Sequence, residues 1–396
     1  MRLLSVGPLP PTPSGVADYT ADLLPHLAGH ADLAVAVPDD APTPEVPYPV
    51  YRHSELTAVT RASFDLPIYH VGNHRFHAEA VRLLGEWPGL VVLHDAVLHH
   101  LYADVMLSRG RVAAYLREVA LDGGAAALRR ALPAARGEAP PAWYEQPLLT
   151  RVLLNARGAI VHSRHAFAAV RRAHPRAVVR LVHHGVASPP DGHPRPPDRP
   201  FTVGTFGGLT EEKRVRAVVG GFALFRRTHA DARLVLGGEA APNLPVGELL
   251  AEHGLADAAE APGRLPLEAM ERLIEECDAV VQVRWPTAGE ASGVTLRALR
   301  LGRPTVVADC GWFAGLPDDA VLKIPPGQPE AVEAASLADA LGRLAADPDL
   351  RARLAAGARA YAARHGWPAA ARAYADFARD LIAAGDPMPL GQVLAS

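Results

Sequence analysis

The segment VRWPTAGEASGVTLRALRLGRPTVVAD (283–309) places an acidic side chain beside a site suited to an anion. The anion site is expected where four consecutive residues open an amphipathic helix: Ser292, Gly293, Val294 and Thr295. Unpaired backbone N–H groups at a helix start bind phosphate or diphosphate. Glu290 cannot favourably contact that phosphate, but it can accept hydrogen bonds from neighbouring hydroxyls while Arg284 balances the charge. A diphosphate carrying a polyhydroxylated group satisfies both requirements, which predicts a nucleotide sugar. The alternative is that Glu290 only stabilises the helix dipole, by about 0.3–1 kcal/mol.

A second loop, GTFGGLTEEKRV (204–215), combines glycines with two cations. Gly207 follows a strand, and Lys213 and Arg214 are expected in the first turns of the next helix. Cations at a helix start oppose the helix dipole, so local stability does not explain them. An anion held by both the glycine backbone and the lysine does. A solvated helix face, with the two preceding glutamates beside the basic pair, is the alternative.

Two loops in the first half of the chain carry further candidates. Gly15 in GPLPPTPSGVADYTADLL (7–24) is expected to open a helix, where it lets a ligand approach the backbone unless it is a plain turn glycine. In LHDAVLHH (93–100), His94 and Asp95 end a strand, and a neutral imidazole can hydrogen-bond a hydroxyl in either direction. A structural histidine and a metal ligand are the alternatives. The loop lacks H-x-x-x-H spacing, and neither a G-x-G-x-x-G fingerprint nor a P-loop is present in the chain.

The elements that must position these residues read as two parallel sheets with crossover helices. Strands are predicted in the first half at 2–6, 32–37, 66–71, 89–95, 158–163 and 177–185, and in the second half at 201–206, 232–238, 278–283, 303–309 and 320–325. Helical sequence follows from about 329 to 384. In such sheets ligands bind beyond the carboxyl ends of the strands, where the loops above are expected.

Composition limits the classes of protein that fit. The 396 residues suggest two domains, and a net charge of -3 gives no basic excess for nucleic acid. Two distant cysteines predict neither a disulfide framework nor a zinc site. We find no signal peptide and no apolar run long enough for a membrane span, so a cytoplasmic location is expected. The only two lysines are Lys213 and Lys323.

The order of motifs resembles the retaining glycosyltransferases of family 4. The matching segments are PSGVADYT, VVLHD, VHS, VHHGV, FGGLTEEKRV, LGGEA, PTAGEASGVTLRALRLGRPTVVADCGWFAGLPDD and YAARHGWPAAARAYADF. The resemblance spans nearly the whole chain and is most specific from 280 to 320. It implies the α/β GT-B fold, with two doubly wound Rossmann-like domains facing across a cleft and a C-terminal helix crossing back to the first domain.

The domain boundaries are expected as follows. An acceptor-side domain covers 1–187, with a helical insertion at about 103–157, and a Pro-rich linker covers 188–200. A nucleotide-sugar-binding domain covers 201–370, and a returning helix and tail cover 371–396. The arginines of the insertion can bind an anionic acceptor or a membrane surface, although a solvated helix face explains them more simply; membrane contact is not indicated.

The resemblance also assigns roles to residues. It implies catalytic roles for His94, which meets the donor sugar, Lys213, which meets the diphosphate, and Glu290, which binds sugar hydroxyls. It places acceptor contacts at Asn73 and Asp95. The remaining donor-binding positions are Gly15, Gly207, Arg214, Gly263, Leu265, Arg284, Ser292, Gly293, Val294 and Thr295.

Two positions depart from the family pattern. The family often has a second glutamate after the first, where this chain has Ala298 or, allowing a deletion, Arg297. It often has an arginine five residues before the lysine, where this chain has Gly208. Arg214, Arg284 or Arg297 can replace that charge, and ribose recognition is left open.

The function implied is transfer of a sugar, with retention, from a nucleotide-diphosphate sugar to a hydroxyl acceptor such as a glycan, glycolipid or natural-product precursor. The route is front-face and independent of metal, with no cofactor beyond the co-substrate. An oxocarbenium-like transition state places growing negative charge on the diphosphate, where fixed N–H donors and Lys213 would stabilise it. The alternatives are a nucleotide-sugar 2-epimerase with the same fold and a catalytically silent nucleotide-sugar-binding protein.

Overall fold

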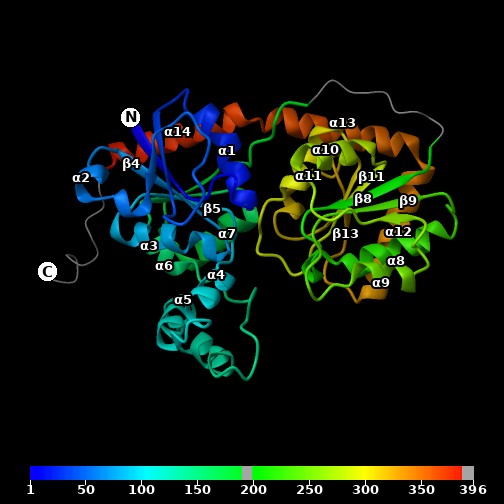
Figure 1. Ribbon diagram of the computed structural model, residues 1–396, viewed down its shortest axis with the longest axis horizontal. Coiled ribbons are helices and arrows are strands. Elements are labelled where there is room, and N and C mark those ends of the chain that lie inside the picture. The colour runs from blue at the N-terminus through cyan, green and yellow to red at the C-terminus, as the bar shows by residue number, and fades with distance from the viewer. Residues whose placement is uncertain (190–198, 386–396) are drawn as a thin grey trace. The chain divides into compact units, whose positions relative to one another are not determined.

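The computed structural model describes residues 1–189 and 199–385 (Figure 1). It divides into two compact units. The first comprises Met1–Gly185, Ala288–Ala291 and Trp367–Ser396, and the second comprises Val186–Thr287 and Ser292–Gly366. The Pro-rich segment predicted as a linker, 188–200, lies largely outside the described residues.

The first unit is built on a seven-stranded parallel sheet in the order β3-β2-β1-β4-β5-β6-β7. The strands are β1 Arg2–Val6, β2 Asp32–Val37, β3 Val50–Arg52, β4 Leu66–Val71, β5 Leu90–Leu93, β6 Gly158–Val161 and β7 Val179–Leu181. The helices are α1 Gly15–Leu27, α2 Ala58–Arg61, α3 Ala78–Glu86, α4 His99–Met106, α5 Val112–Ala135, α6 Thr150–Asn155, α7 Arg164–Ala173 and α14 Trp367–Ala383, with 3₁₀ turns η1 His53–Glu55 and η2 Arg75–His77.

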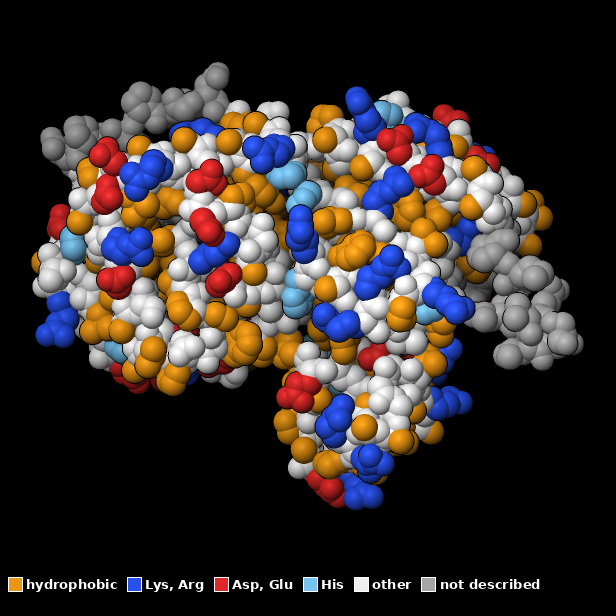
Figure 2. All heavy atoms as spheres, turned by 180° about the vertical axis from the view of Figure 1, so that it is seen from behind, with side chains coloured by type: hydrophobic (Ala, Val, Ile, Leu, Met, Phe, Trp, Pro, Cys, Tyr) orange, Lys and Arg blue, Asp and Glu red, His pale blue; other side chains and the backbone are white. Residues whose placement is uncertain are grey.

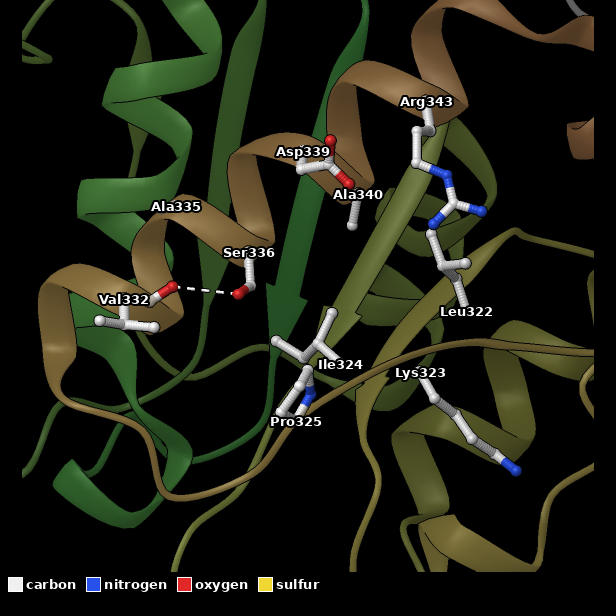
Figure 3. A pocket seen from close by; sticks show the side chains of 10 residues that line it. All are labelled: Leu322, Lys323, Ile324, Pro325, Val332, Ala335, Ser336, Asp339, Ala340 and Arg343. Atoms are coloured by element: carbon white, nitrogen blue, oxygen red, sulfur yellow. Dashed lines mark hydrogen bonds between the residues drawn. The ribbon is translucent and has the colours of Figure 1, made fainter.

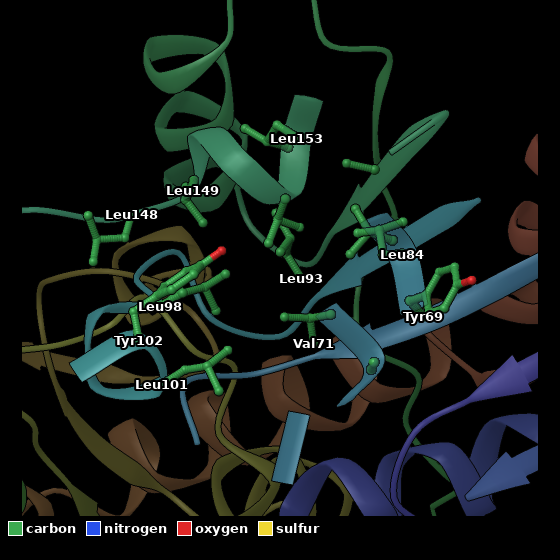
Figure 4. Close-up of a cluster of buried hydrophobic side chains, with 14 of the residues drawn as sticks. Tyr69, Val71, Leu84, Leu93, Leu98, Leu101, Tyr102, Leu148, Leu149 and Leu153 are labelled. Carbon is green, nitrogen blue, oxygen red and sulfur yellow. The ribbon is translucent and has the colours of Figure 1, made fainter. Parts of the chain in front are cut away.

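The central strands of this sheet are mostly apolar because helices cover both faces. Every residue of β4 and β5 is buried. One face packs into a core that also includes residues of the α4–α6 segment, such as Leu98, Leu101, Leu149 and Leu153 (Figure 4). The segment predicted as a helical insertion is therefore packed on the sheet through a continuous apolar core, although α5 is broken by a left-handed Gly124 with φ 63°.

The second unit is built on a six-stranded parallel sheet in the order β10-β9-β8-β11-β12-β13. The strands are β8 Thr202–Phe206, β9 Arg233–Gly237, β10 Ala259–Glu260, β11 Ala279–Gln282, β12 Thr305–Ala308 and β13 Leu322–Ile324. The helices are α8 Val215–Arg226, α9 Val246–Glu252, α10 Leu267–Glu276, α11 Gly293–Arg300, α12 Glu330–Ala346 and α13 Pro348–Arg364, with 3₁₀ turns η3 Glu211–Lys213 and η4 Phe313–Gly315.

Both sheets are doubly wound, since the chain leaves the first strand in one direction and later returns to its other side. The order reverses between β1 and β4 in the first unit and between β8 and β11 in the second. Ligands of open α/β sheets bind at the carboxyl ends of the strands that flank such a switch point. The loops after β1, β4, β8 and β11 are therefore the places to look for a site.

The last described helix, α14, packs on the first unit, as expected for the returning helix. Its Tyr374 hydroxyl lies 2.7 Å from the Tyr19 hydroxyl of α1, and both side chains are buried. Trp367 at its start packs edge-on against the Tyr19 ring, with centroids 5.1 Å apart. Helix α14 thus completes the apolar covering of one face of the seven-stranded sheet.

The distribution of charge on the surface and the apolarity of the helices were also compared with the sequence. On the face drawn in Figure 2, Lys and Arg side chains are interspersed with Asp and Glu side chains, consistent with the net charge of -3. None of the described helices combines the length and apolarity that a membrane span requires.

Candidate functional site

The switch point of the second sheet brings the predicted glycine loop beside the start of α11. Gly207 follows β8 with φ +85°, a left-handed conformation that favours glycine. A Cβ added there would lie 2.7 Å from Lys213 Nζ and 3.6 Å from Val294 Cγ2. Gln282, the last residue of β11, donates from Nε2 to the Phe206 carbonyl at 3.2 Å and joins the two strand ends. Three predicted donor-site residues, Gly207, Lys213 and Val294, are therefore neighbours.

Lys213 is a cation without a carboxylate partner. Its Nζ lies 3.4 Å from the Phe206 carbonyl oxygen, and among residues 1–189 and 199–385 no Asp or Glu is within ion-pair distance of it. Burial, together with the nearby charge of Arg284, lowers the pKa of Lys213 to about 7. A part-buried ammonium beside a second cation is unfavourable in itself, and a bound anion would relieve it.

The start of α11 supplies the amide groups that the sequence predicted. Ser292 is the N-cap, and its Oγ accepts a hydrogen bond from the Thr295 amide at 3.2 Å. The amides of Gly293 and Val294 make no hydrogen bond within the described part of the chain. The Gly293 and Val294 amides are thus available to a ligand, while the Thr295 amide serves the cap. Because Ser292 caps the helix, α11 does not need Glu290 as a capping residue.

Glu290 lies in the short segment 288–291, which groups with the first unit. Within that unit the Ala96 amide donates to the Ala288 carbonyl at 2.6 Å. A Cβ on Gly289, which has φ +80°, would come within 2.8 Å of Ala96 Cβ. The segment carrying Glu290 therefore packs against the residue that directly follows the His94–Asp95 pair. The Glu290 side chain is half-buried.

The three arginines considered as replacements for the family arginine differ in their surroundings. Arg214, left-handed with φ 55°, pairs with the buried Glu333 at 2.5 Å and so is tied to α12. Arg297 pairs with Glu271 at 3.3 Å. The charge of Arg284 acts on Lys213, as the lowered pKa of the lysine indicates. A donor-binding role for each of the three arginines stays a prediction.

The predicted base-flanking loop lies at another strand end of the second sheet. Gly263 adopts φ +75°, and Leu265 Cδ1 would be 3.1 Å from a Cβ built on Gly237, the last residue of β9. The Gly237 carbonyl in turn accepts a hydrogen bond from the Gly207 amide at 3.0 Å. Gly237 at the end of β9 therefore links Leu265 to the glycine loop.

In the first unit, His94 belongs to a cluster of aromatic side chains that was not predicted from the sequence. Its Nε2 lies 3.1 Å from His70 Nδ1, and its ring centroid lies 5.3 Å from that of His162 and 4.7 Å from that of Tyr19. Burial, with the neighbouring His162 and His70, holds the pKa of His94 well below its usual value. His94 is therefore neutral near pH 7, the state that can both donate to and accept from a sugar hydroxyl.

The cluster residues share a signal that was visible in the sequence. His70, His94 and His162 each stand at or directly after the carboxyl end of a strand, in LPIYH, VVLH and AIVH. Adjacent parallel strands bring such positions together, so a histidine at the end of three neighbouring strands predicts a cluster. His184, after β7, adds a fourth ring, 4.6 Å from Tyr19.

Asn73 and Asp95, the predicted acceptor-side residues, contact each other. The Asn73 amide donates to Asp95 Oδ2 at 2.6 Å, which joins the loops after β4 and β5. Gly15 is the first residue of α1, directly after the cap Ser14, and a Cβ there would meet nothing within 4 Å. The fold therefore does not itself require glycine at that position through packing.

A segment of the second unit is similar to a known family of enzymes. Residues 200–347 match the family model described as glycosyl transferases group 1. A 140-residue segment is 34% identical to D-inositol 3-phosphate glycosyltransferase of Saccharomonospora viridis, covering 35% of this chain and 31% of that protein. The chain thus spans about a third of that relative.

Solved structures extend the likeness to the whole fold. Sucrose-phosphate synthase from Thermosynechococcus elongatus aligns over 97% of this chain and 100% of its own, with a TM-score of 0.68 and 18% identity. HepE from Anabaena, solved with UDP and with UDP-glucose, aligns over 96% and 100%, with a TM-score of 0.66 and 16% identity. The chain has the GT-B fold that its sequence predicted.

Proposed function

We propose that the protein is a retaining glycosyltransferase that moves a sugar from a nucleotide-diphosphate sugar to a hydroxyl acceptor. The observation that carries the proposal is the meeting of Gly207, Lys213 and Val294 at the switch point of the second sheet. There a cation without a carboxylate partner lies beside two amides at the start of α11. This arrangement suits a diphosphate, and the match of residues 200–347 to the group 1 glycosyltransferase family supports the same ligand.

The proposed mechanism assigns one task to each group. The Gly293 and Val294 amides and Lys213 stabilise the negative charge that grows on the departing diphosphate, without reorganising as the bond breaks. His94, kept neutral, and Glu290 hydrogen-bond hydroxyls of the donor sugar. In a front-face transfer the leaving phosphate oxygen takes the acceptor proton, so no protein base and no metal is assigned a role.

The first experiment is a thermal-stability screen with UDP-, GDP-, ADP- and dTDP-sugars, beginning with UDP-glucose. A ligand of the folded state raises the unfolding temperature by mass action. At least one nucleotide sugar should stabilise the wild type, and Lys213→Met should remove most of that effect. Lys323→Met is the matched control, because Lys323 is the only other lysine and pairs with Asp318 at 2.7 Å instead.

The second experiment follows the sugar, with the stabilising donor and a panel of hydroxyl acceptors that includes D-inositol 3-phosphate. Transfer with retained anomeric configuration supports the proposal. Isomerisation of the donor sugar without acceptor identifies a 2-epimerase. Donor binding without transfer to any acceptor tested identifies a silent binding protein. Absence of stabilisation by every nucleotide sugar overturns the proposal.

A further inference from the structure

The first unit contains a cavity of about 460 Å³ that the predicted donor site does not use. It lies beside the loop after β4, and the α4 helix and the segment that follows α5 form its other walls. One wall is flat and aromatic, because the ring of His100 stacks on Trp143 with centroids 4.4 Å apart and planes 9° apart. The cavity is therefore built largely by the segment that the sequence marked as an addition to the first domain.

Asn73 fixes the polar side of this wall. Its Oδ1 accepts from the Leu101 amide at 3.2 Å, which leaves Nδ2 to donate to His100 Nδ1 at 2.8 Å. The backbone amide of Asn73 also donates a hydrogen bond to Asp95 Oδ2. Asn73 thus orients the His100 ring and ties the cavity to the turn that carries His94 and Asp95, within one unit.

The rim of the cavity carries charges of both signs. Arg75, Asp104 and Ser108 line it and are exposed. Neither Arg75 nor Asp104 forms a side-chain ion pair within the described part of the chain. Donors and acceptors are therefore both offered to a ligand above an aromatic wall.

We propose that this cavity binds a carbohydrate ring which, if the proposed function holds, belongs to the acceptor. The apolar C–H face of a pyranose or cyclitol packs on a flat aromatic surface, while its hydroxyls need both donors and acceptors around the edge. A lipid chain would make no polar contact with Arg75 or Asp104 and would displace part of the water around them. A polyanion would be repelled by Asp104. The mixed lining fits a polyhydroxylated ring better than either.

The chain offers a matched control cavity. A second groove of about 460 Å³ lies in the second unit between β13 and α12 (Figure 3). It also presents a serine and an aspartate, Ser336 and Asp339. The serines are alike in donating Oγ to a carbonyl four residues earlier, Ser108 to Asp104 and Ser336 to Val332. Ser108→Trp and Asp104→Asn can therefore be compared with Ser336→Trp and Asp339→Asn.

Binding is measured on the full chain without donor, by saturation-transfer NMR with the methyl glycosides of glucose, galactose and mannose, with myo-inositol, and with decanoate. We expect at least one sugar or cyclitol to bind the wild type and both second-groove variants. Ser108→Trp should abolish this binding by filling the cavity. Asp104→Asn, which keeps the shape, should weaken it roughly tenfold through loss of a charged acceptor.

The following results overturn the proposal: no sugar or cyclitol binds the wild type; binding survives Ser108→Trp and Asp104→Asn; the second-groove variants weaken it equally; or only decanoate competes for the cavity. Thermal stabilisation by a nucleotide sugar is measured in parallel and should be unchanged in all four variants. If the chain binds a sugar in this cavity but no nucleotide sugar, the proposed function is wrong and the cavity proposal stands. If it binds a nucleotide sugar but no sugar in this cavity, the proposed function stands and the cavity proposal is wrong.

Discussion

His70 Nδ1 lies 3.1 Å from His94 Nε2, in a hydrogen bond between two imidazoles at the carboxyl ends of adjacent strands. One ring must donate and the other accept, so the tautomer of His70 determines the tautomer of His94. A proton added to the acceptor ring would replace the bond by a contact between two donors. The neutral cluster is thus the arrangement that the fold of the first unit requires.

The first unit should lose stability in mild acid. Burial is the largest cause of low pKa values at three histidines: it lowers the pKa of His70 to about 3 and the pKa values of His77 and His162 to about 4. Below about pH 6.5 the unfolded histidines take up protons that the folded rings do not, so the free energy of unfolding falls as pH falls toward about 4. Each ring contributes up to about 1.4 kcal/mol per pH unit in that range and nothing above it. Urea unfolding at a series of pH values measures the slope.

His162→Asn identifies one contributor to this slope. His162 donates from Nδ1 to the Val182 carbonyl at 2.8 Å, and an asparagine amide can replace that donor. The variant should fold at pH 7 and show a pH slope shallower by about one proton between about pH 6.5 and about pH 4. An unchanged slope would mean that the pKa of His162 does not differ between the folded and the unfolded state.

The hydroxyl pair of Tyr19 and Tyr374 should contribute to the docking of α14. The two oxygens lie 2.7 Å apart and are buried. Tyr374→Phe leaves the Tyr19 hydroxyl without that partner and should lower the free energy of unfolding of the first unit by about 1–3 kcal/mol. The double variant Tyr19→Phe/Tyr374→Phe should lose less than the sum of the two single changes, because it leaves neither hydroxyl unpaired. Additive losses would argue against the hydrogen bond.

The fold was predictable from sequence where burial imposes a pattern. The strands predicted at 2–6, 32–37 and 66–71 coincide with β1, β2 and β4, because central parallel strands are mostly apolar. The short β3 and β10 were missed, since two or three residues at a sheet edge carry no periodic signal. Strand β7 is only Val179–Leu181, shorter than the predicted 177–185, for the same reason.

The candidate site was predictable only in part, because spacing locates loops and not hydrogen bonds. Gly15 and Gly293 do open α1 and α11, as their neighbours indicated. Lys213, however, stands in a 3₁₀ turn before the left-handed Arg214, and not in the first turn of the following α-helix. The ion pair of Arg214 with Glu333 does not follow from local sequence, since it joins residues that are far apart in the chain. The histidine cluster follows only when the ends of several predicted strands are compared with one another.

Donor affinity should depend on pH through Lys213. In the proposed donor site the ammonium form would bind the diphosphate, and a bound anion would raise the pKa of the lysine above the value of about 7 that it has without ligand. The dissociation constant should therefore be constant below about pH 7 and rise by up to roughly tenfold per pH unit above it. Calorimetry in buffers of different ionisation enthalpy should detect proton uptake near pH 8. Equal affinity on both sides of pH 7, or proton uptake that persists in Lys213→Met, would exclude this role.

Transfer should resist chelation. The loops of the sequence carry no pair of carboxylates with metal-binding character, and the proposed mechanism needs no metal ion. The diphosphate charge is instead assigned to Lys213 and the α11 amides. Activity after dialysis against EDTA should match that of the untreated protein. Full loss that is restored by a divalent cation would replace this mechanism with a metal-assisted one.

Glu290→Gln should separate binding of the sugar from folding. The substitution keeps the shape of the side chain but replaces a charged acceptor, which should cost transfer roughly ten- to a hundredfold. The unfolding temperature without ligand should stay near that of the wild type, because Ser292 and not Glu290 caps α11. Glu248→Gln changes an exposed residue on α9; it is the matched control and should keep full activity. Wild-type turnover in Glu290→Gln would remove this carboxylate from the site, whereas loss of activity together with loss of the fold would show that its role is structural.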